Sequence, residues 1–115
     1  MAAMSGADQP VIWSPEAVSD LTEIWQLYAR LVGPPTADRM VLAIGEACRA
    51  LERDPFCGRP RSELRPGIRS LDSGPHVAFY GVMDEVTEII RVVHSGQDLE
   101  AVFCSDPADP RGSAA

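Results

Sequence analysis

Apolar residues recur at steps of three and four along the first half of the chain, and they form short, closely spaced runs along the second half. The first spacing is that of amphipathic helices and the second is that of strands. Before the helical part, residues 11–13 form an apolar stretch just long enough for one short strand. The pattern therefore predicts one short strand, then helices, then a compact set of strands.

Two helices are predicted in the first half. The first begins after Ser14, whose hydroxyl can accept from free backbone amides, with Pro15 at the first helical position. Residues 33–35, Gly-Pro-Pro, are predicted to end it. Thr36 is predicted to cap the second helix, which ends near residue 54, and the short connection makes the two helices an antiparallel hairpin. Their apolar stripes are Ala17, Leu21, Ile24, Trp25, Tyr28, Leu31 and Val32 on the first helix, and Ala37, Met40, Val41, Ile44, Cys48 and Leu51 on the second.

Three strands are predicted after a loop at residues 56–66, namely 68–71, 76–83 and 86–95. Strands joined by short turns pair in antiparallel fashion. Residues 99–103 fit one further turn of helix. Alternation along the last strand predicts one face made of Val86, Glu88, Ile90, Val92 and His94 and the opposite face made of Thr87, Ile89, Arg91, Val93 and Ser95.

The predicted fold class is α+β. A short N-terminal strand and an antiparallel helix hairpin pack on a small antiparallel sheet, in the order β-α-α-β-β-β with a possible C-terminal helical turn. Residues 1–10 are predicted to be a disordered lead, residues 11–104 one domain, and residues 105–115 a disordered tail.

Composition narrows the possible functions. The chain has 115 residues and a formal net charge of −7, which opposes general or sequence-specific nucleic-acid binding. All ten basic residues are arginines, and six of them lie between positions 49 and 69, where a positive band would suit an acidic partner. No stretch is apolar enough to span a membrane and the start resembles no signal peptide, so the expected location is the cytoplasm. The three cysteines have no spacing typical of disulfide frameworks or zinc sites.

Several short motifs occur together and in one order. They are Trp13-Ser-Pro-Glu-Ala17 followed by Asp20-Leu21 and Ile24, then Asp54-Pro55, Gly58-Arg-Pro-Arg61, Leu64-Arg-Pro-Gly-Ile-Arg-Ser70, Phe79-Tyr80 and Ile90-Arg-Val-Val-His94. With them the chain resembles the ParE branch of the ParE/RelE toxin superfamily over about residues 11–103. The resemblance implies the toxin of a type II toxin–antitoxin module, tight binding to a ParD-like antitoxin, and DNA gyrase as the target. We expect no cofactor and no metal.

The sister RelE branch cleaves mRNA on the ribosome, which requires cations near the scissile phosphate and groups that transfer protons. Arg69 matches one arginine of that branch, but Gln97 and Phe103 fall near its basic and tyrosine positions, and neither can do that chemistry. We therefore expect an inhibitor that binds gyrase rather than a catalyst, with no catalytic residues. Two alternatives stay open: a ribosome-dependent endoribonuclease using Arg69, Arg91 and His94, and a degenerate toxin that binds only its antitoxin.

Candidate contact residues follow from charge and from the apolar stripes. A buried Arg91 needs a partner, with Asp72 or Glu88 as candidates. His76 is expected at the surface; it could meet His94 across a hairpin, although two histidines alone do not make a metal site. The candidate target-binding residues are Arg59, Arg61, Arg65, Arg69, Arg91 and His94. The candidate antitoxin-binding residues are Trp13, Leu21, Trp25, Tyr28, Leu31, Met40 and Ile44.

Overall fold

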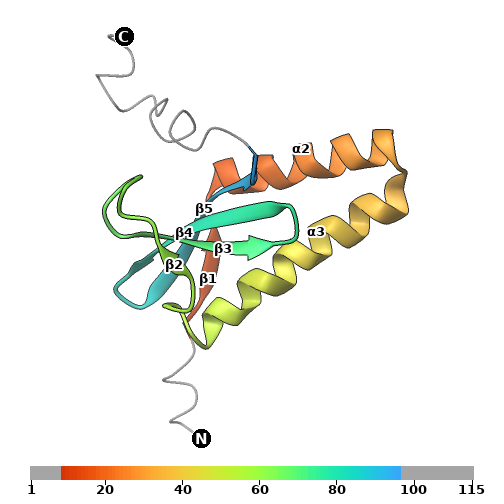
Figure 1. Ribbon diagram of the computed structural model, residues 1–115. Coiled ribbons are helices and arrows are strands. Elements are labelled where there is room, and N and C mark those ends of the chain that lie inside the picture. Colours follow the sequence, from red (N-terminus) through yellow and green to blue (C-terminus); the bar gives the residue numbers. More distant parts are fainter. Residues whose placement is uncertain (1–8, 97–115) are drawn as a thin grey trace, which may run out of the picture.

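Two layers make up the fold: a pair of antiparallel helices covers one face of a five-stranded sheet (Figure 1). The structure is a computed structural model and describes residues 9–96. No helix among these residues is long and apolar enough to cross a membrane. The elements in chain order are β1 (Val11–Trp13), α2 (Pro15–Leu31), α3 (Pro34–Arg49), the 3-10 turn η1 (Ala50–Glu52), β2 (Arg59–Pro60), β3 (Ile68–Ser73), β4 (His76–Met83) and β5 (Val86–His94).

The sheet has the strand order β1-β5-β4-β3-β2. The pairs β2–β3, β3–β4 and β4–β5 are antiparallel, as short turns require. The strand β1 runs parallel to β5, so the sheet is mixed rather than wholly antiparallel. Along the chain, the whole helix hairpin separates β1 from the other strands. This long connection does not force β1 to pair in antiparallel fashion, as a short turn would. The α+β class is confirmed, with β2 as an added strand inside the predicted loop.

The helix starts show one confirmed and one wrong prediction. The hydroxyl of Ser14 accepts from the backbone N–H of Ala17, as expected for the cap of α2. Thr36 does not cap α3, because the cap is Gly33 at φ 108° and the two prolines fill the first helical positions. Proline suits those positions, where a backbone N–H has no intrahelical acceptor. The Thr36 hydroxyl instead accepts from Nη2 of Arg39 within the helix.

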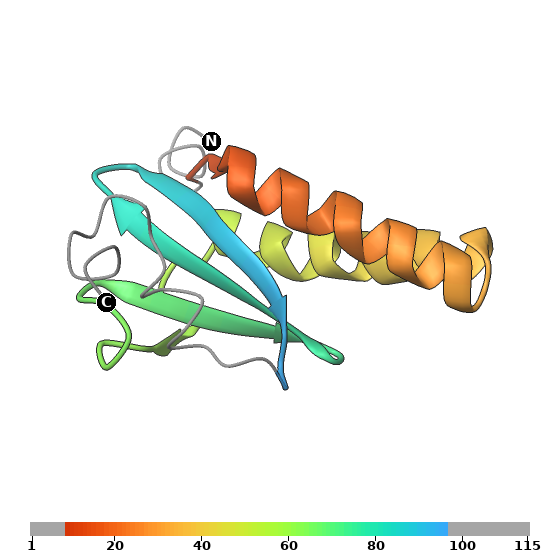
Figure 2. The same ribbon diagram turned by 90° about the horizontal axis from the view of Figure 1, so that it is seen from above.

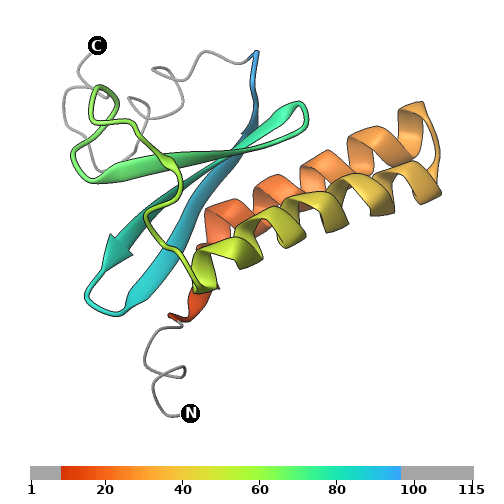
Figure 3. The ribbon, with the colours of Figure 1, turned by 60° about the horizontal axis from the view of Figure 1, so that its bottom comes forward.

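The main core lies between the sheet and the helices. Its fully buried members come from both helices, from η1 and from the central strands: Ala17, Ile44, Cys48, Leu51, Ala78, Tyr80, Ile89 and Val92. A smaller cluster on the opposite sheet face consists of Ile68, Val77, Phe79 and Val93, with Leu64 and Ile90 packed against it. Figures 2 and 3 show that the hairpin end, where α2 meets α3, extends beyond the sheet. Leu31 and Val32 at that end are exposed.

A β-bulge in β5 changes which side chains face the helices. Phe79 pairs with Arg91 and Tyr80 with Ile89, which leaves Ile90 as the extra residue. Ile89 and Val92 therefore both enter the helix-side core, while Ile90 and Val93 pack on the opposite face. The predicted strict alternation is wrong beyond Ile89. The predicted lead, the tail and the helical turn at 99–103 fall on residues outside the described range or at its edge, so those stay predictions.

Candidate functional site

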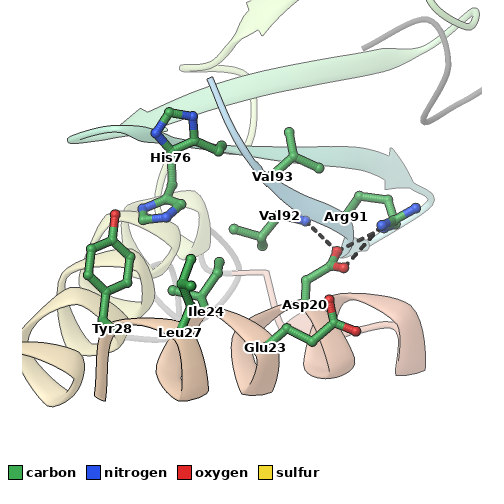
Figure 4. A pocket seen from close by; sticks show the side chains of 10 residues that line it. Asp20, Glu23, Ile24, Leu27, Tyr28, His76, Arg91, Val92 and Val93 are labelled. Atoms are coloured by element: carbon green, nitrogen blue, oxygen red, sulfur yellow. Dashed lines mark hydrogen bonds and ion pairs between the residues drawn. The ribbon is translucent and has the colours of Figure 1, made fainter. Parts of the chain in front are cut away.

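A cleft opens between α2 and β5, and Figure 4 shows its lining side chains. Its volume is about 250 Å³, and acidic, basic, imidazole and apolar groups all contribute to the wall. We call it the α2–β5 cleft. Its lining residues are Asp20, Glu23, Ile24, Leu27, Tyr28, His76, Arg91, Val92, Val93 and His94.

One end of the cleft is closed by Asp20, which points from α2 toward β5 (Figure 4). Its carboxylate accepts from Nε and Nη2 of Arg91 at 2.8 and 3.0 Å and from the backbone N–H of Val92 at 2.9 Å. The hydrogen bond to Asp20 raises the pKa of Arg91. Neither predicted partner of Arg91 is correct. The carboxylate of Asp72 instead lies 3.8 Å from the guanidinium of Arg59. The actual partner of Arg91, Asp20, comes 71 residues earlier in the sequence.

After β1 ends, Ser14 and Asp20 provide the next hydrogen bonds to the edge of β5. The strand β1 pairs with residues 87–89 and then ends. Beyond it, Ser14 donates from its backbone N–H to the carbonyl of Ile89 and from its hydroxyl to that of Ile90, both at 2.9 Å. Asp20 then accepts from Val92. The start of α2 is therefore fixed to the edge of the sheet by polar contacts that satisfy backbone groups at the bulge.

The other end of the cleft holds a histidine pair, His76 and His94. They are register partners across β4 and β5, and their rings meet edge to face with centroids 5.8 Å apart. Tyr28 meets the ring of His76 in the same way, also at 5.8 Å. The predicted meeting of the histidines is confirmed, but His76 is only 2% exposed, so its surface placement is wrong.

Burial, and then the neighbouring charge of His94, lower the pKa of His76. Its Nδ1 atom is buried and has no hydrogen-bond partner among residues 9–96. His94 is exposed, and its Nδ1 accepts from the backbone N–H of Gly96 at 3.1 Å. No group of three or more possible metal ligands gathers within the described part of the chain.

Two of the five candidate target-binding arginines, Arg61 and Arg69, hold the loop before β3 in place. We call residues 56–66 the arginine loop. Nη1 of Arg69 donates to the carbonyls of Phe56 and Gly58 at 3.1 and 2.7 Å, and its guanidinium lies 5.0 Å from the Phe56 ring. Arg61 pairs with Glu63 at 2.7 Å, and this hydrogen bond lowers the pKa of that carboxyl.

The other arginines of this set make different contacts and are exposed to different degrees. Arg61 also lies over the ring of Phe79, 5.6 Å from its centroid. Arg59 reaches only an exposed pair with Asp72, and Arg65 is half-buried and has contacts of its own. The arginines between positions 49 and 69 therefore serve partly to hold the fold together, and the side chains of Arg49 and Arg59 are far more exposed than that of Arg61.

Replacing Arg69 tests this structural role. We expect Arg69→Ala to lower the free energy of unfolding by about 1 to 2 kcal/mol, because two carbonyls lose a charged donor. Arg59→Ala is the matched control, and its exposed pair should contribute less than about 0.5 kcal/mol. Urea unfolding of both variants measures the difference. Equal effects would mean that Arg69 does not clamp the loop.

The candidate antitoxin-binding residues do not form one exposed surface. Ile44 is in the core, Trp13 and Leu21 pack against it, and Met40 is half-buried. Tyr28 lines the α2–β5 cleft. Of the seven, the structure leaves two substantially exposed: Leu31, and Trp25, whose Nε1 donates to Asp38 at 2.8 Å.

Asp20 belongs to one of the short motifs in the sequence, but sequence reasoning missed its role as the partner of Arg91. One signal was available: Asp20 lies three residues after Ala17 and four before Ile24, within the apolar stripe of the helix. A carboxylate at a core-facing position needs a buried partner. Cys48, by contrast, is a plain core residue, and burial raises the pKa of its thiol to about 12.

Comparison with known proteins places the chain among toxins. Residues 11–99 match the family model described as ParE toxin of type II toxin–antitoxin system, parDE. The chain is 34% identical over 88 residues to Toxin ParE1 of Mycobacterium tuberculosis, covering 76% of this chain and 90% of the relative. Among solved structures it resembles the chromosomal ParDE toxin–antitoxin system from P. aeruginosa, with a TM-score of 0.68, 28% identity, and 76% and 97% of the two chains covered. It also resembles the toxin–antitoxin complex RelBE2 from M. tuberculosis, with a TM-score of 0.61, 25% identity, and 79% and 95% covered.

Proposed function

The chain belongs to the ParE toxin family of type II toxin–antitoxin systems, and on this basis we propose that it inhibits DNA gyrase and is neutralised by a ParD-like antitoxin. The observation that carries the proposal is the match over residues 11–99, which spans the helix hairpin, the arginine loop and the α2–β5 cleft. Gyrase inhibition would block replication and so stop growth.

Inhibition by binding, rather than catalysis, suits the state of the basic side chains. A ribonuclease needs cationic groups directed at the scissile phosphate. Arg69 is instead bonded to two backbone carbonyls, and Arg91 is held by Asp20 through two hydrogen bonds. His94 uses Nδ1 to accept from Gly96. Arg69 and Arg91 would have to leave these partners before they could contact a scissile phosphate.

A supercoiling assay with purified gyrase tests the proposal directly. We expect the purified chain to reduce supercoiling in proportion to its concentration, and pre-incubation with the antitoxin encoded beside it to restore activity. Induction in a bacterial host should then give filamentation and early induction of a DNA-damage reporter. Normal supercoiling at a large excess of toxin would contradict gyrase as the target.

The likeness to RelBE2 supports one alternative, a ribosome-dependent endoribonuclease. Incubating the purified chain with programmed ribosomes tests this alternative. Cleavage of the mRNA that is lost in a folded Arg91→Lys variant would show that the chain is a ribonuclease. Neither gyrase inhibition nor mRNA cleavage, with antitoxin binding retained, would identify a degenerate toxin.

The antitoxin is expected to cover exposed apolar side chains near the hairpin end. Leu31 on α2 is 66% exposed, and Leu42 on α3, at 65%, offers a matched control. We expect Leu31→Asp to weaken antitoxin binding by about tenfold or more, since burying a charge in an apolar interface is unfavourable. Leu42→Asp should leave affinity nearly unchanged, and both variants should stay folded with a similar small decrease in melting temperature, because Asp is a weaker helix former than Leu. Titration calorimetry with the antitoxin measures both, and equal losses would mean that α2 does not supply the main contact.

A further inference from the structure

The outer half of α2 rests on the sheet through an aromatic and imidazole contact. Tyr28 is the last residue of α2 among those that line the α2–β5 cleft, and its ring meets His76 of β4. Three residues further along α2, Leu31 is exposed, and the hairpin end has passed the edge of the sheet (Figure 3). The Tyr28–His76 contact is therefore the outermost side-chain contact between this helix and the cleft wall.

The contact depends on a neutral imidazole. His76 is almost fully buried and its Nδ1 has no partner among residues 9–96, so a proton added there would bring an uncompensated charge. His94 stands 5.8 Å away on the neighbouring strand, and a charge on it opposes a second charge on His76. Burial and this neighbour both favour the uncharged form.

Other ionisable groups around the cleft do not remove this penalty. On α2 they are Asp20, Glu23 and Tyr28, and on β5 they are Arg91 and His94. The carboxylate of Asp20 is already bonded to Arg91 and to the backbone of Val92. Figure 4 shows Glu23 beside Asp20, at the Arg91 end of the cleft and away from the Tyr28 end.

We propose that Tyr28, His76 and His94 form an acid-sensitive contact that fixes the outer half of α2 to the sheet, and that protonation of His76 releases it and opens the α2–β5 cleft. The Asp20–Arg91 pair and Ser14 keep the start of α2 in place, because these contacts do not involve the histidines. Access to the half-buried Ile24 in the cleft wall then depends on pH, whereas Leu27 is already exposed.

The direction of the pH effect follows from the lowered pKa. Above the ordinary histidine value of 6.5, His76 is neutral in both folded and unfolded chains, and the contact contributes its full stability. As pH falls below that value the unfolded chain takes up the proton first. Stability is therefore lost progressively as pH falls through the pKa of His76 in the folded protein.

Nuclear magnetic resonance of the full chain between pH 8 and pH 5 tests the proposal. We expect the ring signals of His76 to titrate with a midpoint below 6.5, and cross-relaxation between the Tyr28 and His76 rings to disappear with the same midpoint. Hydrogen exchange, corrected for its intrinsic rate, should show clearly lower protection for residues 27–31 at pH 5 than at pH 8, because the proton favours the released state of His76. Protection of residues 17–21 should be retained.

Three results would overturn the proposal. The first is a Tyr28–His76 contact that persists while His76 is protonated. The second is equal loss of protection along the whole of α2, since that would be global unfolding. The third concerns His76→Leu, which cannot take up a proton and should keep residues 27–31 protected at pH 5. Loss of protection in that variant would exclude His76 as the acid-sensitive group.

His94→Gln separates the two histidines. It removes the neighbouring charge while His76 remains, so the pKa of His76 should rise and the opening should begin at a higher pH. An unchanged midpoint would contradict the part assigned to His94. These experiments use the isolated chain and do not depend on whether gyrase is the target.

Discussion

Gly58→Ala is expected to destabilise the protein by about 3 kcal/mol, more than an alanine at any other glycine between residues 9 and 96. A Cβ at this position would lie 2.6 Å from the backbone carbonyl oxygen of Ser70 and would overlap the hydroxyl of Tyr80. Neither neighbour can give way easily, because Ser70 belongs to β3 and Tyr80 is fully buried in β4.

The same position carries hydrogen bonds that the methyl group would disturb. The backbone N–H of Gly58 donates to the Tyr80 hydroxyl at 2.9 Å, and its carbonyl accepts from Arg69 at 2.7 Å. Moving the chain to relieve the overlap would lengthen both, and an unsatisfied buried group costs about 1 to 3 kcal/mol. The arginine loop would then lose its closest attachment to the sheet.

Gly45→Ala provides the matched control, since it adds the same methyl group on α3 with nothing within 4 Å. In a helix this change should stabilise the protein by about 0.5 to 1 kcal/mol. Chemical denaturation of both variants gives the comparison. If Gly58→Ala cost no more than Gly45→Ala, the close approach at Gly58 would be wrong.

Asp20→Ala is expected to lower the free energy of unfolding by about 3 kcal/mol. The Asp20 side chain is 11% exposed and accepts three hydrogen bonds, two from Arg91 and one from the backbone of Val92. Removal leaves a guanidinium and an edge N–H at the bulge without an acceptor. Breaking a largely buried pair on one side costs more than the pair contributed.

The exposed pair Glu46–Arg49 on α3 is the control for Asp20. Its atoms are 3.7 Å apart and both side chains are about 70% exposed to solvent, so Glu46→Ala should cost about 0.5 kcal/mol or less. A double substitution of Asp20 and Arg91 to Ala and Met should recover part of the loss, because no charge remains unpaired. If Asp20→Ala lowered the free energy of unfolding no more than Glu46→Ala does, Asp20 would not hold α2 to the edge of β5.

Local sequence signals were sufficient for most of the fold, because they rest on interactions within a few residues. Ser14 and Pro15 begin α2 as their capping chemistry requires, and the bounds of β4, His76–Met83, agree with the predicted range. Thr36 shows the limit of such signals. Two prolines that cannot continue one helix can begin the next, and only the backbone conformation of Gly33 decides between these outcomes.

The candidate contact residues were harder to place, since their surroundings come from distant parts of the chain. Arg91 was recognised as needing a partner, but the partner lies 71 residues earlier, on α2. Ile44 and Leu31 belong to apolar stripes of the same kind, yet one is in the core and the other is exposed. Periodicity identifies the apolar face of a helix, and the length of the sheet beneath decides how much of that face is covered.

Short motifs, caps and apolar spacing act locally, and they were enough to predict the toxin family, the α+β class and the order of all helices and strands except β2. The three-dimensional arrangement was needed to show that β1 pairs in parallel with β5, that a bulge at Ile90 changes the faces of β5, and that His76 is buried against Tyr28. The bulge adds one residue between two register pairs, and no period read along a single strand contains that information. The bulge places His94, at the end of β5, opposite His76, at the start of β4.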